Sequence, residues 1–280
     1  MKRNQIIDHL VLLAGVVLMM GPVVVAFLTS THSAVEVYNK GLQISVGNDF
    51  AATYGKVLTQ SAGFNGDITA ASMLKNSFIL GLSFAAGKIV LSMLAAYGIV
   101  YFRFKAGVIV FWMIFTTLLL PLEVRIIPSY EIANDLGLLN TYTGLVVPLL
   151  ASATGTFFFR QFYLSVPDEL LEAARIDGAG PWRFFKDILV PLSSTMMAAL
   201  FIIMFVYGWN QYLWPTLIAT DESYFTIVRG VKQILQSWVG SQIPALNEGM
   251  ALAILAILPP VIVVVLFQRW FIKGLTESDK

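Results

Sequence analysis

The sequence contains no cysteine and only two histidines, His9 and His32. Without cysteine the chain has no disulfide and no thiolate nucleophile, and two histidines leave almost nothing for a soft-metal site. Charged residues are also scarce, at 12% of 280 positions, and the formal net charge is +1. So small a charge creates no field that recruits nucleic acid. We therefore expect no catalytic residue, no metal site and no nucleic-acid partner.

Apolar residues, in contrast, make up 57% of the chain, far more than in an ordinary soluble domain. A helix crosses the hydrocarbon with about 20 apolar residues, because each backbone group then finds its partner inside the segment. Six windows of this kind occur: 10–28, 78–100, 106–122, 142–159, 192–213 and 250–267. The sequence therefore predicts an all-α membrane protein with six transmembrane helices. The first window is too long for the core of a secretory signal, so we predict that it is retained.

Lysine and arginine indicate the orientation, because they normally accumulate on the cytosolic side. Of the eighteen, eleven lie on one predicted side and six on the other, and only Lys88 lies inside a span. Both termini should therefore face the cytosol. The stretches 29–77 and 214–249 should then face outward, and 160–191 should form a cytosolic loop within a single transmembrane domain, 1–280.

The cytosolic loop is patterned as two short helices. Ser165 is placed to cap a helix that has Pro167 in its first turn, and Gly178 suits the left-handed position that ends a helix. A second helix should begin near Trp182 and lead through Pro191 into the fifth span. The loop should thus form a compact protruding unit with a glycine hinge.

A second interpretation of this loop is an amphipathic segment that lies on the lipid surface. Trp182, Phe184 and Phe185 would then sit among the headgroups, while Arg183 and Lys186 would face phosphates. The residue pattern alone does not decide between the two.

The stretch EAARIDGAGPWRFFKDILVP resembles the cytosolic loop of ABC importer permeases. It has Glu-Ala-Ala, a glycine six residues after the glutamate, and a later Ile-x-Leu-Pro, with Val190 where leucine is usual. In that family the loop is a coupling helix that docks on a separate ATPase subunit. The resemblance therefore implies a set of ATPase-coupling residues: Glu172, Ala173, Ala174, Gly178, Ile188 and Pro191.

Three further stretches extend the resemblance: FWMIFTTLLLPLEVRIIPSYEI, LLASATGTFFFRQFY and VYGWNQYLWPTLI. They are similar to the second permease subunits of bacterial sn-glycerol-3-phosphate importers, within the maltose-type carbohydrate group. This similarity implies a multi-pass protein of the bacterial cytoplasmic membrane that forms half of a pore. Its partners would be a second permease subunit in a heterodimer, two copies of an ATPase and a periplasmic binding protein. The substrate would be sn-glycerol-3-phosphate or a glycerophosphodiester, with another sugar or polyol as the alternative.

ATP and Mg²⁺ should be bound by the partner ATPase, because this chain has no phosphate-binding loop of its own. The nearest match, from Gly81 to Lys88, has five residues between its glycines instead of four, and Ile89 stands where serine or threonine is required. We therefore expect no cofactor in this chain.

Two basic residues are candidates for the substrate pathway. A lysine inside a span is costly and is a functional candidate by default, although a partner helix or a backbone carbonyl could equally satisfy Lys88. Arg125, near the outer end of the third span, could offer a phosphate monoester a planar two-point contact. The alternatives for Arg125 are an ion pair with Glu123 or Glu131, or a contact with a docking protein.

Asn210 and Gln211 are further pathway candidates, at the outer end of the fifth span. Four aromatic residues surround them: Tyr207, Trp209, Tyr212 and Trp214. This pattern favours an interfacial aromatic belt over a pathway lining.

Two other functional classes are disfavoured. An ion-coupled secondary transporter would need intramembrane acids or a broken-helix site, and the sequence predicts neither, since no aspartate or glutamate falls within the six windows. A membrane enzyme would need clustered histidine, aspartate or glutamate. The sequence shows no such cluster.

Overall fold

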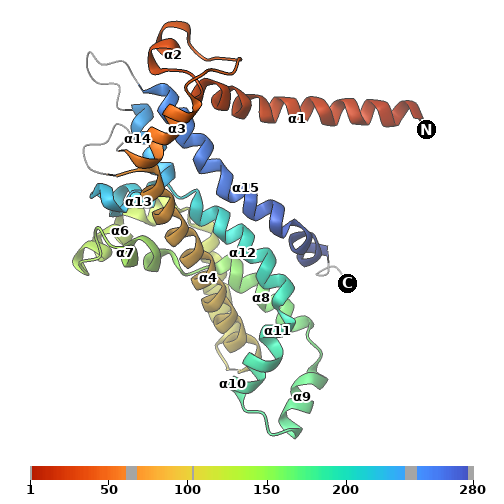
Figure 1. Ribbon diagram of the computed structural model, residues 1–280. Helices are drawn as coiled ribbons and strands as arrows, with labels where there is room; N and C mark the ends of the chain where they lie inside the picture. The colour runs from red at the N-terminus through yellow and green to blue at the C-terminus, as the bar shows by residue number, and fades with distance from the viewer. Residues whose placement is uncertain (1, 61–67, 103, 237–244, 277–280) are drawn as a thin grey trace. The chain divides into compact units, whose positions relative to one another are not determined.

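A computed structural model describes residues 2–60, 68–102, 104–236 and 245–276, and the regular elements in these ranges are all helices (Figure 1). The chain divides into two compact units. The first consists of Met1–Ser77 and Asp221–Pro259, and the second of Phe78–Thr220 and Pro260–Lys280. The long helices α4 (Ala70–Tyr101) and α15 (Leu246–Thr276) contribute residues to both.

The first unit adds five elements: α1 (Lys2–Ser30), α2 (Ala34–Lys40), α3 (Phe50–Thr59), η4 (Glu222–Tyr224) and α14 (Ile227–Gln236). Polar contacts join the short elements to the long helices. Lys56 of α3 forms an ion pair with the buried Glu248 in the first turn of α15. Ser77 of α4 accepts a hydrogen bond from the backbone N–H of Ile227, at the start of α14. These contacts join α3 to α15 and α4 to the start of α14.

The second unit contains the remaining elements: α5 (Gly107–Thr116), η1 (Thr117–Leu119), α6 (Leu122–Asp135), α7 (Tyr142–Val146), η2 (Val147–Leu149), α8 (Ala153–Ser165), α9 (Asp168–Ile176), α10 (Pro181–Phe184), η3 (Phe185–Leu189), α11 (Val190–Leu192), α12 (Ser194–Trp209) and α13 (Leu213–Ile218). Its core is aromatic. The ring centroid of Trp209 lies 5.0 Å from that of Phe78 and 5.6 Å from that of Phe205. The indole of Trp214 is fully buried and donates to the backbone oxygen of Gly144.

Three of the six predicted spans are confirmed as continuous helices. The windows 10–28, 78–100 and 250–267 fall within α1, α4 and α15, which are long and apolar enough to cross a membrane. The all-α prediction also holds for the described residues. Their length and composition allow three spans, or up to six if each of three bent helix pairs counts as one span.

The other three windows, 106–122, 142–159 and 192–213, were predicted to be continuous and are not. Each contains a bend of more than 40°, between η1 and α6, between η2 and α8, and between α11 and α12. The backbone is extended at Pro121 and Ser152 and leaves the helical region at Ser193. A hydropathy window depends only on side-chain composition, so it cannot predict these changes in backbone dihedral angle. The expectation that no helix is broken is therefore wrong.

Candidate functional site

The loop helix α9 begins at Asp168, later than a cap at Ser165 would place it, and it is not capped as predicted. Pro167 occupies the position before the helix and makes no side-chain cap, while Asp168 and Glu169 lie in the first turn. Ser165 instead ends α8, where its hydroxyl donates to the backbone oxygen of Phe162. Two acidic side chains near the positive end of the helix dipole still favour this start.

The end of α9 confirms that Gly178 occupies the left-handed position that ends the helix. Its φ is +71°, in the left-handed region that glycine enters without the steric cost of a Cβ. The Gly178 N–H donates to the backbone oxygen of Arg175, and the Ala179 N–H donates to that of Ala174 at 2.8 Å. These two bonds form a Schellman motif and satisfy carbonyls that the end of a helix would otherwise leave unpaired.

The second part of the loop is less regular than predicted. Pro181 starts α10 one residue before the expected position, and η3 is a π-helical turn in which the N–H of Val190 donates to the oxygen of Phe185. Proline lacks an N–H and its ring clashes with the carbonyl four residues earlier, so a widened turn ahead of Pro191 removes this conflict. Pro191 lies in α11, before the bend at Ser193.

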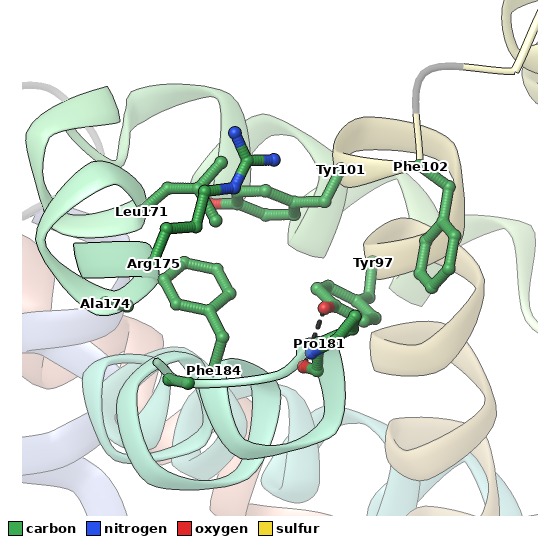
Figure 2. Close-up of a pocket in the computed structure, with 9 residues that line it drawn as sticks. Tyr97, Tyr101, Phe102, Leu171, Ala174, Arg175, Pro181 and Phe184 are labelled. Carbon is green, nitrogen blue, oxygen red and sulfur yellow. Dashed lines mark hydrogen bonds between the residues drawn. The ribbon is translucent and has the colours of Figure 1, made fainter. Parts of the chain in front are cut away.

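An aromatic cavity lies between this loop and the end of α4. Its volume is about 200 Å³, and Figure 2 shows the rings of Tyr97, Tyr101 and Phe184 facing it. The hydroxyl of Tyr97 donates to the backbone oxygen of Pro181 at 2.8 Å, and its ring centroid lies 5.0 Å from that of Phe185. The loop is therefore tied to α4 by a hydrogen bond and by ring contacts.

The six predicted coupling residues differ in exposure. Glu172, Ala173, Gly178 and Pro191 are exposed, Ile188 is half-buried, and Ala174 is buried against the aromatic cavity. Two large apolar side chains of the loop, which are not among the six, are strongly exposed: Ile176 at 86% and Trp182 at 65%. The surface that the loop presents therefore includes Glu172 and Ala173 but not Ala174.

A second and larger cavity lies within the second unit and brings Lys88 and Arg125 together. It has a volume of about 670 Å³, within the range of small-molecule sites. Residues of α4, α5, η1, α6, α8 and α12 line it. Its polar lining consists of Lys88, Ser92, Thr117, Arg125, Ser152, Thr154, Thr156 and Tyr207.

Lys88 is 8% exposed and is held by its own chain. Its ammonium donates to the backbone oxygen of Ala151 at 3.1 Å and lies 4.3 Å from the ring centroid of Phe84. The backbone carbonyl that was predicted as one way to satisfy Lys88 is therefore present. Lys88 also lines the larger cavity, so the hydrogen bond to Ala151 is compatible with the pathway role predicted for this residue.

Arg125 is exposed, and neither of the carboxylates proposed as its partner pairs with it. The ion pairs found among the described residues are His32–Glu36, Lys40–Glu36, Lys56–Glu248 and Arg183–Asp187. The guanidinium thus keeps its donors available on the wall of the larger cavity.

Asn210 and Gln211 belong to a different hollow, of about 540 Å³, which shares only Ile203 and Tyr207 with the larger cavity. Gln211 is buried and donates to the backbone oxygen of Tyr207 at 3.4 Å, whereas Asn210 is exposed. The predicted aromatic belt is wrong for Trp209 and Trp214, because both side chains are fully buried in the protein core.

Sequence reasoning did not single out Tyr97 and Tyr101, which join α4 to the loop. Their spacing of four residues, at the end of an apolar window, places both on one helix face. This spacing could have indicated that the two tyrosines contact the same partner segment. Ser152, at the start of α8, was missed as well, because only the fold brings it near Lys88. In the described part of the chain, no three histidine, aspartate or glutamate side chains are close enough to hold a metal ion.

Comparison with known proteins places the chain among transport-system permeases. The sequence profile of the family described as binding-protein-dependent transport system inner membrane component matches residues 88–277. The chain is 47% identical over 277 residues to the sn-glycerol-3-phosphate transport system permease protein UgpE of Rhizobium meliloti, covering 99% of this chain and 98% of that protein. The protein of the same description from Yersinia pestis is 48% identical, with 99% and 97% covered.

A solved structure shares the fold. It is a bacterial ABC transporter involved in the import of the acidic polysaccharide alginate, with a TM-score of 0.82. The match covers 96% of this chain and 97% of that one, at 19% sequence identity. At this identity the similarity shows the fold alone.

Proposed function

This chain belongs to the family of binding-protein-dependent transport system inner membrane components, and we propose that it forms half of the translocation pathway of an ATP-driven importer for sn-glycerol-3-phosphate. It is an inner-membrane permease subunit and is not itself catalytic. The choice of substrate rests on the close similarity, over nearly the whole length, to permease proteins of systems described as transporting sn-glycerol-3-phosphate.

We propose that the chain acts with a second permease subunit, two copies of an ATPase subunit and a periplasmic binding protein. ATP and Mg²⁺ would bind to the ATPase. The chain would form one transmembrane domain, 1–280, with both termini and the loop 160–191 on the cytosolic side. The distribution of lysine and arginine along the sequence supports this orientation.

The loop would couple ATP hydrolysis to transport. Glu172 and Ala173 are exposed and suit direct contact with the ATPase, while Gly178 sets the angle between the loop helices. Ile188 and Pro191 lie at the junction with α12, and Ala174 would act by packing α9 against α4. Motion of the ATPase would reach the spans through the hydrogen bond from Tyr97 to Pro181 and the ring contacts beside it.

The bends in three predicted spans do not favour a secondary transporter. Broken helices alone are compatible with either class, because non-helical backbone is tolerated wherever protein or a cavity surrounds it. Family membership and the coupling-loop pattern both support the ATP-driven class.

Copurification followed by an uptake assay tests this function. The tagged chain is extracted from native membranes in a gentle detergent, with a known importer processed in parallel as a control for complex integrity. A second permease and an ATPase should copurify in stoichiometric amounts, and proteoliposomes with this complex and its binding protein should take up sn-glycerol-3-phosphate only with ATP. Isolation of the chain alone would overturn the proposal. Uptake of a different polyol would retain the importer and reject the substrate.

A further inference from the structure

Among the described residues, the wall of the larger cavity has two cations and no anion. Lys88 and Arg125 line it, and no aspartate or glutamate is found among the described residues that form the lining. Like charges that share a partly dehydrated space repel one another, and a bound anion removes that repulsion. The composition of the wall therefore favours an anionic ligand.

Both cations keep hydrogen-bond donors for such a ligand. An ammonium has three donors, and Lys88 makes one hydrogen bond in the described structure, to Ala151. Arg125 forms no ion pair among the described residues, so its planar fork is available for a two-point contact with phosphate oxygens.

The start of α8 adds a third favourable feature. Ser152 precedes this helix of 13 residues, and Ser152, Ala153 and Thr154 all line the cavity. The first backbone N–H groups of a helix lack partners within the helix, and the helix dipole is positive at that end. In α8 the Ser152 hydroxyl accepts from the N–H of Gly155, so the dipole and the N–H groups ahead of Gly155 are what this end offers a ligand. The break between η2 and α8 thus places a half-helix terminus at the same cavity as two basic side chains.

We propose that this cavity binds the phosphoryl group of a doubly charged phosphate monoester during transport, with Lys88 as a fixed point charge and Arg125 as the two-point contact. This inference rests on the proposed function and adds to it the side chains that would hold the phosphoryl group and the reason why they favour a monoester over a diester. A monoester carries about −1.5 to −2 charges at pH 7, whereas a diester carries only one. Two cations therefore match a monoester better than they match a diester.

The roles of the two residues differ physically. Lys88 is buried and its position is set by Ala151 and Phe84, so its charge stays in place when the cavity is empty. Arg125 is exposed and has no ion-pair partner among the described residues, so it can follow the ligand.

The test uses the complete importer in proteoliposomes, with its binding protein and ATP. Initial uptake is measured for two probes, sn-glycerol 3-phosphate and the singly charged diester glycerophosphoglycerol, together with ATP hydrolysis stimulated by the loaded binding protein. The variants are Lys88→Met, Arg125→Met and the double variant. Lys75→Met is the matched control, because Lys75 is an exposed lysine of the same helix outside the cavity lining.

We expect Lys88→Met to lower monoester uptake by at least about tenfold, because one charge-assisted contact to the ligand is lost. Diester uptake should fall less, so that the ratio of monoester to diester uptake decreases. Stimulated ATP hydrolysis is measured for every variant to show whether the complex is still assembled. Lys88→Arg keeps the positive charge and should retain most of the monoester uptake, which also controls for misfolding.

Several outcomes would overturn the inference. Wild-type monoester uptake by the Lys88→Met and Arg125→Met variants would exclude a role in binding, and an equal loss for both probes would exclude selection by charge. An equally large loss in Lys75→Met would assign the effect to α4 in general. If the wild-type importer carries no phosphate ester at all, the proposed function fails, which is a different result from failure of the variants alone.

Discussion

The cytosolic loop and the larger cavity are built in opposite ways. The loop's turn is closed by hydrogen bonds between near neighbours, such as Gly178 with Arg175 and Ala179 with Ala174. The cavity depends on contacts between distant segments: Lys88 bonds a carbonyl 63 positions away, and Ser92 bonds one 60 positions away. A local backbone change should therefore damage the loop alone, whereas the cavity should respond to changes in how helices pack.

The largest effect is expected for Gly178→Pro. Proline fixes φ near −65°, whereas this position has φ of +71°. The turn that ends α9 cannot form, so we expect ATP-dependent uptake to fall to background while the chain still inserts in the membrane. Uptake in proteoliposomes and the amount of chain in membranes measure the two properties. Normal uptake by this variant would remove Gly178 from coupling.

A milder version of this test compares the same substitution at two neighbouring glycines. No atom lies within 4 Å of a Cβ built at Gly178 or Gly180, so only the dihedral angle differs. Gly178→Ala should cost about 1–2 kcal/mol because of its left-handed φ, whereas Gly180→Ala, at φ −71°, should have little effect. Thermal unfolding in detergent and uptake measure the difference, and equal behaviour of the two variants would contradict it.

The cavity wall is expected to be sensitive at Gly155, the next largest effect. A Cβ at this position would clash with the hydroxyl oxygen of Ser92 and lie 3.0 Å from its Cβ. Either the Ser92 hydroxyl must leave its hydrogen bond to the Ser152 backbone oxygen, or α8 and α4 must separate. We expect Gly155→Ala to destabilise the protein by about 1–3 kcal/mol through overpacking and to lower uptake.

The control for Gly155 is Gly98→Ala, also in a helix but with no atom within 4 Å of the added methyl group. Alanine in an open helical position should be neutral or slightly stabilising. Thermal unfolding in detergent distinguishes the two variants. A Gly155→Ala protein as stable as the Gly98→Ala protein would show that the wall is not tightly packed.

Tyr97→Phe tests the connection between α4 and the loop and should have a smaller effect. It removes a hydrogen bond of 2.8 Å to Pro181 and leaves the ring contacts, at an expected cost of about 0.5–1.5 kcal/mol. Tyr101→Phe removes a longer bond, 3.4 Å, to the backbone of Tyr163 and should cost less. We expect Tyr97→Phe to reduce uptake per ATP hydrolysed. Identical ratios in the two variants would argue against Tyr97 as a coupling contact.

The smallest effect is a pH dependence at His32, which belongs to neither the loop nor the cavity. Hydrogen bonds to Glu36 and to the backbone of Ser45 raise the pKa of His32 above its ordinary value. A raised pKa in the folded state contributes stability below about pH 6.5, and this contribution is lost as pH rises through the folded pKa. Wild type should therefore lose more stability between about pH 5.5 and 8.5 than His32→Gln does. Parallel pH profiles of thermal unfolding would contradict this.

Much of the loop could be predicted because its determinants are adjacent in sequence. Gly178 was expected in the left-handed region and is found there. The cap at Ser165 was predicted wrongly because α8 continues to that residue, so its hydroxyl bonds within the preceding helix. Local patterns indicate that a helix begins, but they do not show where the previous helix stops.

The cavity was only partly predictable. Charge in an apolar context was enough to select Lys88 and Arg125 individually. It did not indicate that they share a cavity, and it did not indicate the breaks that let the chain turn at Pro121 and Ser152. Trp209 and Trp214 have the composition of an interfacial belt, yet both are buried in the protein core.

The sequence by itself determined the membrane class, the helical content and the turn at Gly178, because hydropathy and backbone preference are properties of neighbouring residues. Only the tertiary structure decided which apolar windows are broken, that Ala174 packs inward, and that Lys88 and Arg125 line one cavity whose described lining holds no carboxylate. These features depend on which distant segments pack together. The packing follows from side-chain fit across the whole unit and not from any single window.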